Sequence, residues 1–143
     1  MKPPSVVAVD REAEAFASLF VAAREMGVRI GWLDLAGESA APIPEDLARA
    51  AALGAMRAVQ VRADRVVTVK PIAGPAVLRD LVREHFLGCG LVLARGLDGW
   101  PKLEPAAMGF ELRSAADRRR SFAAAELLAE LLRPRHRMSA GTR

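Results

Sequence analysis

Residues 65–86 read RVVTVKPIAGPAVLRDLVREHF, a stretch that combines a strand, a turn and a helix. The run VVTV at 66–69 consists of β-branched residues, which pack well on a pleated surface, so it predicts a buried central strand. Gly74 permits a tight turn and Pro75 suits a first helical position, so a helix is expected from about Pro75. Apolar residues then recur at helical spacing up to Phe86, which predicts a helix packed on a sheet by one face.

The loop between this strand and this helix is a candidate anion site. Its backbone N–H groups and the helix dipole would lie at the carboxyl end of a strand, beside Lys70 and Gly74. It is not a G-x-x-x-x-G-K-[ST] phosphate cradle, because Lys70 precedes the loop and no Ser or Thr opens the helix. An ordinary strand-to-helix connection with an exposed lysine explains the same residues and is the favoured interpretation.

Further strands and helices alternate along the chain. Strands are predicted at 5–9, 28–35, 56–61, 91–95 and 107–113, and helices at 10–27, 44–53 and 121–132. The fold class is therefore α/β: a single compact domain with a mixed, mostly parallel sheet, one β-hairpin at 56–69 and about four helices. The alternation resembles Rossmann-like or flavodoxin-like layering, but AVDREAEA after the first strand lacks the G-x-G-x-x-G of a dinucleotide site.

Composition bounds the class of protein. With 143 residues, the chain is expected to form one domain at 1–133 followed by a basic, disordered tail at 134–143. There is no Tyr and only two Trp, so few aromatic side chains are available to stack on bases. One Cys and two His exclude an internal disulfide and a classical zinc cluster, and no cofactor is assigned. No leader or long apolar run is recognised, so a cytoplasmic location is expected.

Polar residues stand at the ends of several predicted strands. Because the carboxyl ends of parallel strands meet at one edge of an α/β sheet, they could form a ligand site together with the loop after the second strand. The predicted ligand-binding residues are Asp10, Asp34, Glu38, Ser39, Lys70, Gly74 and Arg95. Asp10 is also the expected N-cap of the first helix. The hairpin reverses one strand, so this constellation depends on the topology.

No reaction can be assigned from nucleophiles. Ser39 or Cys89 could pair only with His85, the one histidine of the predicted domain, and no G-x-S-x-G is present. His85 shares a helix face with Leu78 and Leu81, which favours a half-buried packing role. Cys89 lies between two glycines at a helix carboxyl end, which favours a small buried thiol. Whether the protein is an enzyme stays open.

Charge adds one further hypothesis. The formal charge is +4, and seven arginines lie in the last 26 residues, while the rest of the chain is close to neutral. A run of arginines can contact phosphate backbones, but it can also simply keep a chain end soluble, and the second explanation is favoured. Three hypotheses result: binding of a small phosphorylated or carboxylated ligand at the sheet edge, a non-catalytic protein-interaction or accessory module that is expected to form a homo-oligomer such as a dimer, and, less favoured, weak nucleic-acid binding through the tail.

Overall fold

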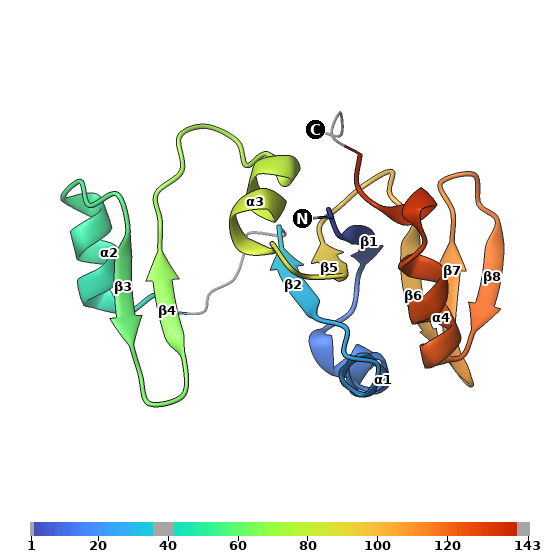
Figure 1. The fold of residues 1–143 in the computed structure, drawn as a ribbon. Coiled ribbons are helices and arrows are strands. Elements are labelled where there is room, and N and C mark those ends of the chain that lie inside the picture. Colours follow the sequence, from blue (N-terminus) through green and yellow to red (C-terminus); the bar gives the residue numbers. More distant parts are fainter. Residues whose placement is uncertain (1, 36–41, 140–143) are drawn as a thin grey trace. The chain divides into compact units, whose positions relative to one another are not determined.

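A computed structural model describes residues 2–35 and 42–139, and the chain divides into two units. The first unit comprises Met1–Gly37 and Leu78–Arg143, and the second comprises Glu38–Val77. The fold class is α/β, as predicted: the described residues form a six-stranded, mostly parallel sheet, a separate two-stranded antiparallel sheet and four α-helices (Figure 1). Among these residues, no helix has both the length and the apolar character needed to cross a bilayer.

The six-stranded sheet belongs to the first unit and has the order β2-β5-β1-β6-β7-β8. Strands β2, β5, β1 and β6 are parallel, whereas β7 and β8 extend the sheet in antiparallel fashion. The bounds are Ser5–Val9 for β1, Ile30–Asp34 for β2, Leu91–Arg95 for β5, Lys102–Ala106 for β6, Gly109–Arg113 for β7 and Arg119–Phe122 for β8. The mixed, mostly parallel sheet is thus confirmed.

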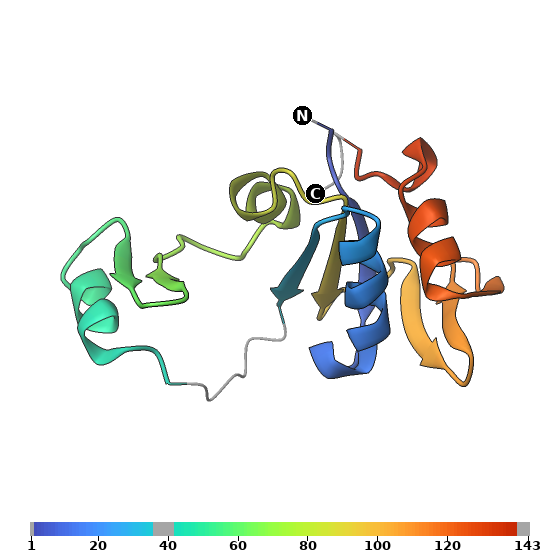
Figure 2. The ribbon, with the colours of Figure 1, turned by 60° about the horizontal axis from the view of Figure 1, so that its bottom comes forward.

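Helices cover both faces of this sheet. On one face, α1 (Ala17–Glu25), the preceding 3-10 helix (Ala13–Phe16) and α4 (Ala124–Leu131) pack on alternate residues of the central strands, such as Val7 and Leu93. On the other face, α3 (Leu78–His85) packs on Val6 and Val92. Because the two central strands are buried on both sides, their sequences SVVAV and LVLAR are almost continuously apolar (Figures 1 and 2).

The second unit contains α2 (Glu45–Ala52) and the hairpin of β3 (Ala58–Val61) and β4 (Val66–Val69). The predicted hairpin is present, but the prediction that Val66–Val69 is a buried central strand is wrong. Strand β4 pairs only with β3, and Val66 is 59% exposed. The β-branched run at 66–69 therefore predicted a strand correctly, but it did not show whether that strand is buried. The mixed character of the main sheet comes from β6, β7 and β8 and not from this hairpin.

Several other boundaries differ from the predictions. Helix α3 begins at Leu78 and not near Pro75. The strand predicted at 107–113 is β7, which begins at Gly109, and α4 starts at Ala124 rather than at Ser121. The predictions include no strand at the positions of β6 and β8. Charged residues and Pro105 gave β6 and β8 little strand propensity, so pairing with β7 decides their conformation.

The C-terminal segment packs on the first unit. Pro134–His136 forms a 3-10 helix, and Arg137 forms an isolated antiparallel β-bridge with Ser5. The Met138 N–H donates a hydrogen bond of 3.0 Å to the Pro4 carbonyl oxygen. Met138 is 6% exposed and packs beside Val6. Residues 134–139 thus belong to the folded unit, unlike the predicted disordered tail from 134, and residues 140–143 lie outside the described residues.

Candidate binding pocket

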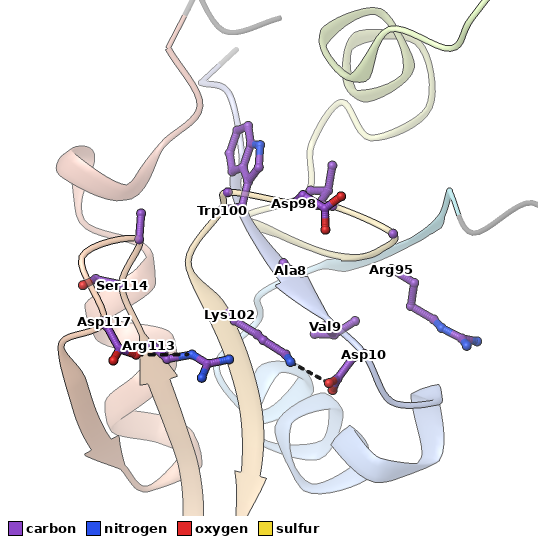
Figure 3. Close-up of a pocket in the computed structure, with 14 residues that line it drawn as sticks. Ala8, Val9, Asp10, Arg95, Asp98, Trp100, Lys102, Arg113, Ser114 and Asp117 are labelled. Atoms are coloured by element: carbon purple, nitrogen blue, oxygen red, sulfur yellow. Dashed lines mark ion pairs between the residues drawn. The ribbon is translucent and has the colours of Figure 1, made fainter.

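A pocket of about 540 Å³ lies at the carboxyl ends of β1 and β5. The loop 96–101 after β5 and the turn 114–118 after β7 form its walls (Figure 3). Its charged lining residues are Asp10, Arg95, Asp98, Lys102, Arg113 and Asp117. This is the edge at which open α/β sheets bind ligands.

The register of β6 brings Lys102 into the pocket. Strand β6 joins β1 through the single pair Ala8↔Lys102, next to a hydrogen bond of 2.8 Å from the Ala8 N–H to the Pro101 carbonyl oxygen. Strand β6 therefore begins level with the end of β1 and runs beyond it. Lys102 consequently faces Asp10, with 2.6 Å between Nζ and Oδ2 (Figure 3).

Lys102 and Arg113 form a like-charged pair across two strands. They are paired directly between β6 and β7, a position where two cations repel each other. Glu104 lies between them, with Oε1 at 3.1 Å from Lys102 Nζ and 3.7 Å from Arg113 Nη2. Arg113 Nε is also 3.9 Å from Asp117 Oδ1. The contacts of Arg113 are longer than hydrogen bonds, so its planar donors are loosely held by these carboxylates.

The Asp10–Lys102 pair keeps both groups ionised. The hydrogen bond from Lys102 lowers the pKa of Asp10, and the bond to Asp10, followed by that to Glu104, raises the pKa of Lys102. Both shifts move the pKa away from neutrality, so the pair supplies fixed charges rather than a general acid or base. Asp10 does not act as the predicted N-cap, because Glu12 occupies the cap position of the 3-10 helix, without a side-chain cap bond.

The rim of the pocket is shaped by the loop after β5. Gly96 and Gly99 adopt φ of 82° and 75°, left-handed conformations that glycine adopts readily. Trp100, which follows them in the loop, lines the pocket and also packs on the core beneath α3. Arg95 lies on the side of the pocket opposite Arg113 and extends away from Lys102 (Figure 3). Its Nη1 is 3.9 Å from Asp34 Oδ2.

The predicted site residues separate into three groups. Asp10 and Arg95 line the pocket, and Asp34 adjoins it through its ion pair with Arg95. Lys70 and Gly74 belong to the second unit, where Lys70 is exposed and Gly74 has φ of 76°. Glu38 and Ser39 lie outside the described residues.

The sequence did not point to Lys102 and Arg113 as site residues. One signal was available: Leu103 in β6 is buried between Lys102 and Glu104, as alternation in a half-buried strand requires. The same alternation places Arg113 next to buried Leu112 at the end of β7. Assigning 102–106 as a strand would have brought both cations to one edge.

The other candidate groups do not join this pocket. The His85 side chain is 44% exposed and its ring lies edge-on to Phe86, with 6.4 Å between the ring centroids, which agrees with the predicted half-buried packing role. Burial raises the pKa of the Cys89 thiol, which packs beside the core under α3. Among residues 2–35 and 42–139, no three His, Cys, Asp or Glu side chains are grouped so as to hold a metal ion.

Comparisons with known proteins do not identify a family. No family model matches the sequence, and no curated protein is significantly similar to it. Among solved structures, the crystal structure of Bacillus subtilis MobB is similar with a TM-score of 0.48 and 19% identity, over 73% of this chain and 69% of that chain. This likeness carries nothing about ligand or activity, so the function has to be inferred from the pocket itself.

Proposed function

We propose that the pocket at the carboxyl ends of β1 and β5 binds a small ligand with a phosphate or carboxylate group. The observation that carries the proposal is the convergence of Lys102 and Arg113 on one wall of the pocket, directly opposite each other in the register of β6 and β7. Glu104 and Asp10 offset the repulsion at Lys102, whereas the contacts of Arg113 with Glu104 and Asp117 are longer than hydrogen bonds, so the Arg113 donors can turn to an anion in the pocket. A guanidinium can also hold a phosphate or carboxylate through two parallel hydrogen bonds.

The shape of the pocket supports the same proposal. Its volume of about 540 Å³ lies within the range of small-molecule sites. Trp100 also lines the pocket, with its indole pointing away from Lys102 and Arg113, and Arg95 lies at the rim opposite Arg113 (Figure 3).

Thermal unfolding of the full chain in the presence of nucleotides, sugar phosphates and carboxylates tests this proposal. A ligand at about 100 times its Kd adds about 2.7 kcal/mol to the free energy of unfolding, which raises Tm by several degrees. We expect Arg113→Gln to abolish the shift caused by the active compound. The charge-matched variant Arg24→Gln, at an exposed position of α1 outside the pocket, should retain the shift.

A third variant separates the pocket from the loop site predicted by the sequence. Lys70→Gln alters the second unit only, so the pocket proposal expects an undiminished shift. If Lys70→Gln removes the shift while Arg113→Gln keeps it, the ligand binds at the loop and the pocket proposal is wrong. The pocket proposal also fails if no compound in the panel raises Tm.

A further inference from the structure

A second charged region of the first unit surrounds Glu130 and shares no residue with the pocket lining. Glu130 lies in the last turns of α4 and is 4% exposed. Its carboxylate contacts Arg120 of β8 at 3.3 Å, Arg133 at 3.3 Å, His136 at 2.9 Å and Arg135. Three guanidinium groups thus share one negative charge, and we call these three arginines with Glu130 and His136 the Glu130 cluster.

The cluster gathers the excess charge of the chain. The last 26 residues hold seven of the 21 basic and two of the 17 acidic residues, a net charge of +5, so the preceding residues carry −1. The fold brings β8 beside α4 at the edge of the sheet (Figures 1 and 2). Arg120 of β8 therefore lies on one surface with Arg133 and Arg135, which follow α4. Their side chains are 56–61% exposed although Glu130 is buried.

We propose that the Glu130 cluster binds the phosphate backbone of duplex nucleic acid. The sequence alone favours tail arginines that only keep the chain end soluble, whereas here a buried carboxylate fixes three of them in position. Preorganised guanidinium groups are suited to bidentate contacts with phosphate. Because Glu130 neutralises only one of three positive charges, the cluster keeps a net positive charge for a polyanion.

Two further features favour duplex nucleic acid over other polyanions. No large apolar side chain is exposed between residues 109 and 139, so the elements that carry the cluster present no apolar anchor of the kind found in protein interfaces and membrane-inserting segments. The Arg120 guanidinium lies over the Phe122 ring, 4.9 Å from its centroid, and the ring also packs against the core, so it is not open for base stacking. The surface is therefore suited to backbone contacts that carry no sequence information.

Fluorescence anisotropy of a labelled mixed-sequence DNA duplex with the full chain, between 50 and 200 mM salt, tests the proposal. If about three phosphates are contacted, log K should fall with log salt at a slope of about −2.7, a loss of roughly 40-fold over this range. The double variant Arg120→Gln/Arg133→Gln should reduce the slope to about −0.9 and the loss to roughly fourfold. It leaves Glu130 with Arg135 and His136.

The control is the double variant Arg24→Gln/Arg49→Gln, which removes the same charge from exposed positions on α1 and α2. It should keep the wild-type slope. Equal losses in the two double variants would show a general charge effect and overturn the proposal. Competition supplies a second check. The proposal is also overturned if polyglutamate or anionic vesicles, added at the same total charge as unlabelled DNA, displace the labelled duplex equally well.

Discussion

At the scale of single residues, Glu130 should make stability depend on acid pH. Its hydrogen bonds to His136 and Arg135 lower its pKa from 4.5 to about 2. A carboxyl group with a lowered pKa stabilises the fold fully above its unfolded pKa, and this contribution is lost as pH falls from about 4.5 to about 2. In urea unfolding measured from pH 7 to pH 2.5, the free energy of unfolding should decline through this window. The decline should be shallower for the Glu130→Gln variant than for the wild type.

The comparison with the variant isolates Glu130 from the other carboxylates. Glu126 lies in the first turn of the same helix, and its exchange in Glu126→Gln should leave the acid dependence as in the wild type. Parallel pH curves for the wild type and Glu130→Gln would contradict the assignment of a lowered pKa to Glu130.

At the scale of elements, the β7–β8 pairing depends on Gly109. This glycine has φ of 124°, and a Cβ built there would lie 2.2 Å from the Phe122 carbonyl oxygen in β8. Gly109→Ala should therefore lower the free energy of unfolding by more than the 1–3 kcal/mol typical of backbone strain, because strand separation adds to it. Gly27→Ala provides the control, since Gly27 has φ of 69° but open space around it. If denaturant unfolding shows that Gly109→Ala and Gly27→Ala lose the same free energy of unfolding, Gly109 has no steric role.

At the scale of the whole molecule, the two units should differ in stability. In the second unit, only Leu47 and Ala58 are buried hydrophobic residues among the described positions 42–77, whereas β1 and β5 are buried almost throughout. A two-stranded sheet with so little buried area is marginally stable. Amide hydrogen exchange should therefore be faster in β3 and β4 than in β1 and β5.

Leu47→Ala sharpens this expectation. Truncation of a core leucine costs at least about 2 kcal/mol, which here would come off the free energy of unfolding of the second unit. Amide exchange in β3 and β4 should then become about 30-fold faster, while exchange in β1 and β5 stays unchanged. If exchange accelerates equally in all four strands, the two units unfold together, and the prediction that they differ in stability is wrong.

The sequence by itself determined the fold class, most of the strands and part of the pocket. Continuous apolar runs identified β1 and β5, and the polar residues at their ends, Asp10 and Arg95, lie at the sheet edge and line the pocket. These features depend on neighbours along the chain, so periodicity and propensity reveal them.

The tertiary structure alone decided the rest. Only strand order shows that β4 lies outside the main sheet and that β6 begins beside the end of β1, which brings Lys102 to Asp10. Only packing of α4 on β8 gathers distant arginines around Glu130. Strand order and helix packing depend on contacts between residues far apart in the chain, which local sequence patterns do not encode.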